Sequence, residues 1–250
     1  MIPLLQFLAL AAHPCVGGMI EAGDVARVSL CLEVARQEQA IGVPAWLAGR
    51  MGRTAAWIAD ELADDGRMTS DEIAAVLAIG RGESALDAGG RSHSALPDEQ
   101  QGGSHGALQM TARTAAWLGV DMGQLRPRRP GVLGDHAKAA RYAARAALTF
   151  YETRTGLARR VGVPTHLEAL RRIARSDQHL RDELWASWAA GCGVRVRQAG
   201  PGLRRTLEKR NKQFPRYQLA VHRWMGDVGP AHEEPLTTAA LLQPSEVSAE

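Results

Sequence analysis

Apolar residues recur at intervals of three and four along most of the chain, the spacing of one face of an α-helix. This pattern predicts helices over 24–40, 53–64, 70–84, 135–153, 165–175, 177–190 and 203–224. We expect Asp135 to cap the helix that starts there. Only 5% of the residues are aromatic, and alanine is abundant, which suits close-packed helices. The sequence therefore predicts a mainly α-helical fold with a minor β element.

The helix expected over 70–84 carries the main candidate for chemistry. Thr69 and Glu72 have the spacing of a capping box at its start. Glu83 lies four residues after Ile79, so its carboxyl shares the buried face of the helix. Burial and the negative end of the helix dipole both raise a carboxyl pKa. We therefore expect Glu83 to hold a proton near neutral pH, as a glycosidic acid catalyst must.

A structural role for Glu83 stays open beside the catalytic one. A glutamate at a helix end can turn to solvent, or it can pair with Arg81 or Arg91. A glycine-rich break and a polar loop follow it, and residues 104–110 then read Ser-His-Gly-Ala-Leu-Gln-Met. This second block looks suited to holding a polar polymer beside the acid.

The order and spacing of these motifs resemble those of a known family. Glu-Ser at 83–84, Ser92 nine residues after the acid and Gly-Ala-Leu-Gln at 106–109 resemble the E-S, A-x-S and G-L-M-Q motifs of bacterial lytic transglycosylases. Residues 185–193 resemble the A-Y-N-A-G-x-G segment of that family, and 214–225 resemble its closing helix. The family's fold is related to goose-type lysozyme. The resemblance implies a lysozyme-like α+β domain with a small β-hairpin.

The resemblance also implies roles for individual residues. Glu83 would protonate the oxygen between N-acetylmuramic acid and N-acetylglucosamine in peptidoglycan, and would then accept the proton of the C6 hydroxyl as a 1,6-anhydro sugar forms. The substrate's own acetamido group would stabilise the charge at C1. Ser92 would hydrogen-bond the acid or that acetamido group, and Gln109 would contact the sugar. Ser104 and Trp188 complete the expected substrate-binding residues.

The chain also departs from the family pattern. Trp188 stands where the family usually has a tyrosine whose hydroxyl reaches the acid, and Ala189 stands where it has asparagine. An indole donates one hydrogen bond and accepts none, so Trp188 would act as a hydrophobic wall or a stacking surface. The gap from Ser92 to Gly106 is longer than is common, and it contains a Pro97 that indicates a surface excursion.

Two readings of the same domain therefore stay open. One is a muramidase that hydrolyses the same bond, with Asp87 or Asp98 as a weak candidate for positioning water. The other is a wall-binding structural component that has lost catalysis. The departures from the family pattern at Trp188 and Ala189 are the reason to consider it. For a transglycosylase, Asp87 is not needed as a nucleophile.

Several other chemistries lack support. Residues 102–106 match G-x-S-x-G, but the polar stretch before them cannot be the buried strand that a nucleophile elbow requires. The histidines and cysteines do not have zinc-ligand spacing, and no Walker or G-x-G-x-x-G loop is present. We expect neither a metal nor a cofactor.

Charge is distributed unevenly. Residues 126–216 contain 21 basic and 7 acidic side chains, whereas 1–125 contain 8 basic and 15 acidic ones. A basic body attracts polyanions, among them envelope polymers and nucleic acid. A nucleic-acid-binding module is thus a distant alternative. No zinc finger, RRM or recognition helix accompanies the charge, so we expect no nucleic-acid partner.

The ends of the chain bear on organisation and location. We expect an N-terminal helical extension over 1–68, the lysozyme-like domain over 69–226 and an acidic disordered tail over 227–250. The apolar segment 1–12 is too short to cross a bilayer and lacks the basic start of a secretory signal. The expected location is the periplasm or cell envelope, reached by an unassigned export route.

The expected partners are peptidoglycan glycan strands. Components of a secretion or conjugation apparatus or of a phage virion are further candidates, because such machines open the wall locally. The three cysteines imply no disulfide framework, although a bridge between Cys15 and Cys31 stays open for an exported chain.

Overall fold

The structure is a computed structural model. It describes residues 13–21, 24, 27–66, 68–90, 103–153 and 196–226, with the single residues 168, 182, 185, 186 and 188. The α-helices within these ranges are α2 (Pro14–Glu21), α3 (Val28–Gln39), α4 (Ala45–Ala63), α5 (Ser70–Ser84), α6 (Ala112–Leu118), α7 (Leu133–Thr153) and α11 (Pro201–Met225). Short 3₁₀ turns cover Asp64–Gly66, Met122–Leu125 and Val196–Gln198.

One small antiparallel sheet accompanies the helices. Strand β1 (Ser104–His105) pairs with β2 (Met110–Thr111), with Ser104 opposite Thr111. The predicted mainly helical fold with a minor β element is confirmed for the described residues. The predicted helices at 165–175 and 177–190 lie almost wholly outside them.

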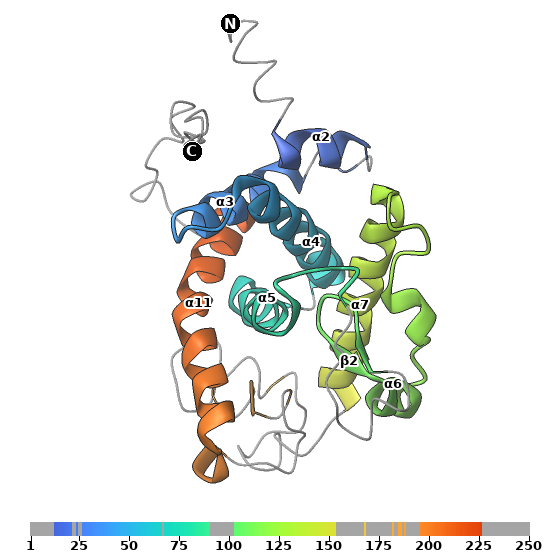
Figure 1. The fold of residues 1–250 in the computed structure, drawn as a ribbon, viewed down its shortest axis with the longest axis vertical. Coiled ribbons are helices and arrows are strands. Elements are labelled where there is room, and N and C mark those ends of the chain that lie inside the picture. Colours follow the sequence, from blue (N-terminus) through green and yellow to red (C-terminus); the bar gives the residue numbers. More distant parts are fainter. Residues whose placement is uncertain are drawn as a thin grey trace, which may run out of the picture.

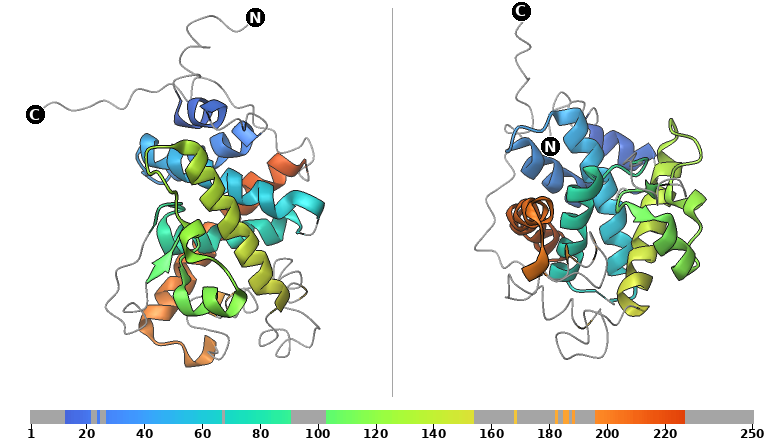
Figure 2. Two further views of the ribbon diagram at one scale, coloured as in Figure 1. Left: turned by 90° about the vertical axis from the view of Figure 1, so that its right-hand side faces the viewer. Right: turned by 60° about the horizontal axis from the view of Figure 1, so that its bottom comes forward.

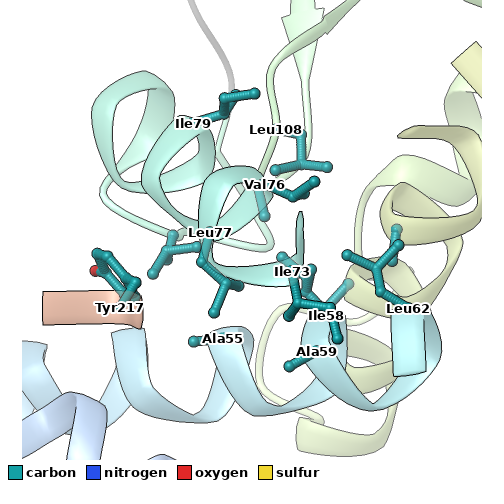
Figure 3. Packing of buried hydrophobic residues seen from close by; sticks show 14 of the residues in the cluster. Ala55, Ile58, Ala59, Leu62, Ile73, Val76, Leu77, Ile79, Leu108 and Tyr217 are labelled. Atoms are coloured by element: carbon teal, nitrogen blue, oxygen red, sulfur yellow. The ribbon is translucent and has the colours of Figure 1, made fainter. Parts of the chain in front are cut away.

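Helix α5 lies at the centre of the arrangement, with α4, α7 and α11 around it (Figure 1). Two further views show the same central position (Figure 2). Ile73 of α5 lies beside Ile58 of α4, and Leu77 of α5 lies near Ala55 of α4 and Tyr217 of α11 (Figure 3). Each large aliphatic side chain buried in this way contributes about 1.5–3 kcal/mol.

The residues before 69 share this core. The buried cluster runs without a break in packing from Cys15 of α2 through Val34 of α3 and Trp57 of α4 to Val221 of α11. Helices α3 and α4 thus form part of the same hydrophobic core as α5. The proposed tail over 227–250 lies outside the described residues.

Helix α5 has the predicted bounds and the predicted capping box. The Glu72 carboxylate accepts a hydrogen bond of 2.6 Å from the Thr69 backbone N–H. This contact satisfies a backbone donor that the first turn would otherwise leave without a partner. The position of Glu83 in the last turn of α5 therefore follows from local sequence alone.

Helix α7 begins two residues before the predicted position, at Leu133, so Asp135 does not cap it. Asp135 lies in the first turn and accepts hydrogen bonds from the backbone N–H and the guanidinium of Arg129. Its carboxylate thus fastens the preceding loop to the helix, where a short acidic side chain is also favoured by the helix dipole.

Helix α4 begins at Ala45, eight residues before the predicted start, and two glycines in its first half are packing positions. A Cβ built on Gly52 would lie 2.4 Å from the carbonyl oxygen of Cys31 in α3, and one on Gly49 would lie 2.5 Å from Cβ of Pro14 in α2. The helices approach one another too closely for any side chain there. Glycine has a low intrinsic helix propensity, so tertiary packing accounts for its presence at these two positions.

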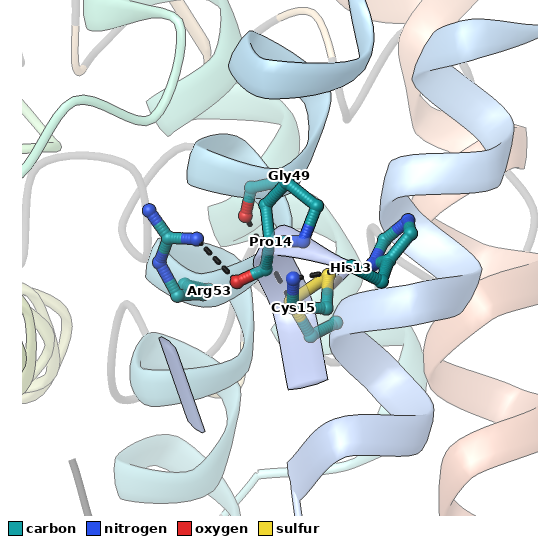
Figure 4. Close-up of a disulfide and its surroundings, with 6 residues drawn as sticks. His13, Pro14, Cys15, Gly49 and Arg53 are labelled. Atoms are coloured by element: carbon teal, nitrogen blue, oxygen red, sulfur yellow. Dashed lines mark hydrogen bonds between the residues drawn. A yellow bond between two sulfur atoms is a disulfide. The ribbon is translucent and has the colours of Figure 1, made fainter. Parts of the chain in front are cut away.

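A disulfide joins α2 to α3 beside this contact (Figure 4). Cys15 and Cys31 are bonded, with their Cα atoms 5.7 Å apart, and both are fully buried. Arg53 of α4 donates a hydrogen bond of 2.5 Å to the Pro14 carbonyl, which also ties α2 down. In the described parts of the chain, none of the helices is both long and apolar enough to span a membrane.

Candidate active site

Glu83 is held by an arginine from the far end of the chain. The Arg210 guanidinium of α11 donates a hydrogen bond from Nη2 to Oε1 of Glu83 and forms an ion pair with it. The Glu83 side chain keeps 24% of its surface exposed, whereas that of Arg210 is fully buried. Arg81, the nearer candidate partner, instead pairs with Glu38 of α3 at 3.0 Å. The carboxyl is therefore sheltered from bulk water but remains reachable.

The surroundings of Arg210 fix the direction of its guanidinium. Nη1 donates a hydrogen bond of 2.9 Å to the backbone oxygen of Trp185, a residue that is itself fully buried. Gly82 makes room beside it, because a Cβ there would lie 3.1 Å from Nε of Arg210. Among the described residues, that Nε has no hydrogen-bond partner. The hydrogen bonds to Trp185 and Glu83, and the close approach of Gly82, thus fix the orientation of the guanidinium.

The protonation of Glu83 reflects two opposing effects. Burial raises the pKa of its carboxyl above the ordinary value, and the charge and hydrogen bond of Arg210 draw the pKa partly back. The net direction is upward. A carboxyl with a raised pKa that also has a fixed cationic partner can donate a proton and later accept one.

Ser84 connects the end of α5 to the loop at 106–109. Its Oγ donates a hydrogen bond of 2.6 Å to the carbonyl of Ala107 and accepts one of 3.0 Å from the backbone N–H of Asp87. The backbone N–H of Gly106 also donates to the carbonyl of Gly90 at 2.9 Å. Ser84 and the Gly-Ala-Leu-Gln block therefore lie next to one another.

Gln109 lies against the segment that follows Glu83. A Cβ built on Gly90 would be 3.1 Å from Nε2 of Gln109 and 3.2 Å from Cβ of Ser84. The amide also donates a hydrogen bond of 2.8 Å to the carbonyl of Gly106, which folds the side chain back over its own turn. Gln109 therefore lies next to the turn that follows α5.

Trp188 braces the same loop. Its indole Nε1 donates a hydrogen bond of 3.1 Å to the carbonyl of Leu108, next to Gln109. The ring packs edge-on against Phe150 at 5.0 Å and lies 5.9 Å from Tyr151, both at the end of α7. Half-buried among these rings, Trp188 holds the loop through its one donor instead of replacing the tyrosine hydroxyl at the acid.

The other predicted residues are placed less centrally. Ser104 is half-buried in β1, and Ser92 lies outside the described residues, as does Asp98. Asp87 turns toward α4, where Arg50 lies 3.4 Å from its carboxylate, and it also accepts from the Gly89 backbone N–H. These contacts make Asp87 a loop-fixing residue.

Backbone strain is concentrated at this place. Three non-glycine residues of the described chain have positive φ: Ala85 and Leu86, directly after Glu83-Ser84, and Gln109. Each left-handed conformation of this kind costs about 1–2 kcal/mol. Strain that persists at one place is typical of sites where geometry serves a function.

Sequence reasoning missed Arg210, although a signal was present. Leu207, Phe214 and Tyr217 recur at helical spacing and are buried, and Arg210 occupies the same stripe between them. A charged residue at a core position of an amphipathic helix requires a buried partner of opposite charge. The separation of 127 residues hid which carboxylate that partner was.

Comparison of the chain with protein-family models, with curated proteins and with solved structures finds no significant match. Within the described part of the chain, no group of three or more histidine, cysteine or acidic side chains could hold a metal ion.

Proposed function

We propose that the chain is a peptidoglycan lytic transglycosylase with a lysozyme-like catalytic domain, in which Glu83 acts as the general acid and then as the general base. The observation that carries the proposal is the placement of Glu83. Its sheltered carboxyl lies in the last turn of the central helix and has a raised pKa, and the next residue, Ser84, hydrogen-bonds the loop of Gln109 through the Ala107 carbonyl. Arg210 supplies the polar support that the family's tyrosine would otherwise give.

The proposed reaction uses the two oxygens of one carboxyl. Arg210 occupies Oε1 of Glu83, which leaves Oε2 as the atom that would deliver the proton to the glycosidic oxygen. As the C1–O bond breaks, the ionised carboxylate is stabilised by the adjacent guanidinium. The carboxylate then takes the proton of the C6 hydroxyl while that oxygen bonds to C1, so the acid is regenerated and no water is consumed.

The Asp87 contacts favour this reaction over hydrolysis. A muramidase needs a second carboxylate that is free to position water or to act as nucleophile. Asp87 is instead occupied by Arg50 and by the Gly89 backbone N–H. Digestion of purified sacculi followed by mass spectrometry separates the two, because anhydro ends weigh one water less than reducing ends. Reducing ends alone would overturn the proposed lyase reaction.

A non-catalytic wall-binding component is the second candidate, and the Glu83–Arg210 pair is the observation that favours it. A buried arginine can retain a glutamate for structural reasons only. Release of no muropeptides by the wild-type chain, together with retained binding to sacculi, would support this reading.

An envelope location accompanies the proposal. The Cys15–Cys31 disulfide supports an oxidising compartment, where such bonds persist. The glycan substrate lies in that same compartment.

A further inference from the structure

A cationic cavity lies away from Glu83, on the first half of α7 and the loop before it. Its volume is about 760 Å³, within the range of small-molecule binding sites. Asp135 is its one acidic lining residue. Six basic side chains line the cavity: Arg126, Arg128, Arg129, Lys138, Arg141 and Arg145.

Half of these basic groups have acidic partners that account for their positions. The partnered ones join α7 to the rest of the fold or to its own preceding loop. The three ion pairs are Arg129–Asp135 at 2.9 Å, Arg141–Asp24 at 2.6 Å and Arg145–Glu61 at 2.5 Å.

The other three basic side chains have no ion-pair partner among the described residues. Arg126, Arg128 and Lys138 make no ion pair with any residue that the structure describes, although Lys138 lies close enough to Asp135 to help lower the pKa of that carboxyl. Three like charges around one cavity repel one another, and no ion pair offsets this repulsion. An anion in the cavity would remove that repulsion.

The loop that carries two of these charges is fixed in advance. It reads Arg-Pro-Arg-Arg-Pro over 126–130, and each proline ring restricts φ. The Arg129 backbone N–H donates to Asp135 at 3.1 Å, and His136 Nε2 is hydrogen-bonded to the Pro130 carbonyl at 2.7 Å. A ligand would therefore lose little of its binding free energy to ordering the loop.

We propose that this cavity binds the phosphate groups of a phosphodiester-linked polyol of the cell wall. Arginine forks match phosphate oxygens in pairs, and a cluster of cations without ion-pair partners fits repeated phosphate charges better than a single carboxylate. The choice of a wall polymer as the phosphate source rests on the proposed function; the affinity for phosphate does not.

The lining disfavours nucleic acid as the occupant. Single-stranded nucleic acid is bound by stacking of bases on exposed aromatic rings. Tyr142 is the one aromatic residue of the lining, and it is half-buried, with its hydroxyl accepting a hydrogen bond of 2.9 Å from the Asp121 backbone N–H. No stacking surface is therefore offered among the described lining residues.

Helix α7 runs from the cavity to the neighbourhood of the candidate active site. Lys138 is on α7, whose far end carries Tyr151, a residue close enough to Arg210 to act on its pKa. A separation of thirteen residues corresponds to about 20 Å along the helix. A wall polymer held at the cavity would thus place the chain beside the glycan without obstructing Glu83.

The test compares two charge-matched triple variants of the full chain. Arg126→Gln/Arg128→Gln/Lys138→Gln removes the unpaired cations of the cavity. Arg205→Gln/Lys209→Gln/Lys212→Gln removes the same charge from exposed positions of α11. Binding of poly(glycerol phosphate), inorganic phosphate and a single-stranded oligonucleotide is measured by calorimetry at several salt concentrations, with circular dichroism as the check on folding.

We expect the wild type to bind poly(glycerol phosphate), the cavity triple to bind it about 10- to 100-fold more weakly, and the α11 triple to stay within about threefold. Inorganic phosphate should compete at the same cavity with lower affinity. Equal weakening by both triples would overturn the proposal, as would absence of binding by the wild type. Tighter binding of the oligonucleotide, lost in the cavity triple, would replace the wall polymer by nucleic acid.

Failure of this inference is distinguishable from failure of the proposed function. On purified sacculi free of phosphate polymers, the cavity triple should release muropeptides at the wild-type rate. Polymer binding without any muropeptide release would support the phosphate site and reject the transglycosylase activity. Muropeptide release without polymer binding would support the transglycosylase and reject the phosphate site.

Discussion

The fully buried guanidinium of Arg210 donates a hydrogen bond to the carboxylate of Glu83, across 127 residues of sequence. One member of this ion pair is closed off from water, while the other keeps part of its surface open. The pair therefore connects the stability of the fold with the chemistry proposed for Glu83.

Replacing Arg210 should move the pH profile of activity. Burial raises the pKa of Glu83 and Arg210 lowers it, so Arg210→Met should raise that pKa further. The proton donor is lost as pH rises through the pKa, so the decline of kcat at high pH should shift to a higher pH. Muropeptide release measured from pH 4 to 9 gives the profile, and circular dichroism checks the fold. Arg210→Lys, which keeps the charge, should shift it less; an unchanged profile in the methionine variant would exclude the coupling.

The same raised pKa predicts how stability depends on pH, independently of any activity. A group whose folded pKa lies above its unfolded value near 4.5 contributes stability below that value and loses it as pH rises through the folded pKa. The free energy of unfolding of the wild type minus that of Glu83→Gln should therefore fall between about pH 4 and the folded pKa. Urea unfolding at a series of pH values measures it. A difference that grows with pH would mean that Arg210 dominates over burial.

Trp188 should act mainly through its single hydrogen bond. Trp188→Phe keeps an aromatic ring beside Phe150 but removes the donor to the Leu108 carbonyl, a change worth about 0.5–1.5 kcal/mol. We expect the melting temperature to fall slightly and KM for glycan fragments to rise, because the Gln109 loop is less firmly held. Trp188→Tyr, which restores a hydroxyl donor, is the matched control. A lower kcat with unchanged KM would instead indicate a direct effect on Glu83.

The disulfide should matter for stability and leave chemistry alone. Cys15 and Cys31 are 16 residues apart, and closing a loop of that size stabilises the fold by about 3 kcal/mol. Cys15→Ala/Cys31→Ala should lower the free energy of unfolding by about that amount while the rate of muropeptide release in the folded state is retained. Denaturant titration with and without reductant measures the effect. Reductant should leave the double variant unchanged; an equal effect on both chains would place the redox sensitivity elsewhere.

Local signals in the sequence predicted α5 well and could not predict its partner. The Thr69–Glu72 capping box and the spacing from Ile79 to Glu83 are properties of neighbouring residues, so the helix bounds and the inward-facing position of Glu83 followed from them. The contact with Arg210 depends on how α11 packs on α5. A charged residue on the buried face of a helix indicates that an oppositely charged partner exists, but it does not identify that partner.

Short helices and close contacts escaped the sequence pattern for a similar reason. Helices α2 and α6 have 8 and 7 residues, too few for a clear period. Gly52 reads as a weak helix former, whereas its lack of a side chain is what lets α4 approach α3. These features depend on tertiary packing, which a local sequence pattern does not contain.

The most direct measurement is the rate of 1,6-anhydro muropeptide release from purified sacculi by the wild type, Glu83→Gln and Asp87→Asn. A positioned acid alone contributes about 10²–10⁴-fold, and here one carboxyl serves twice. We expect Glu83→Gln to lose at least that factor and Asp87→Asn to stay within severalfold of the wild type. Equal release by the wild type and Glu83→Gln would contradict the account.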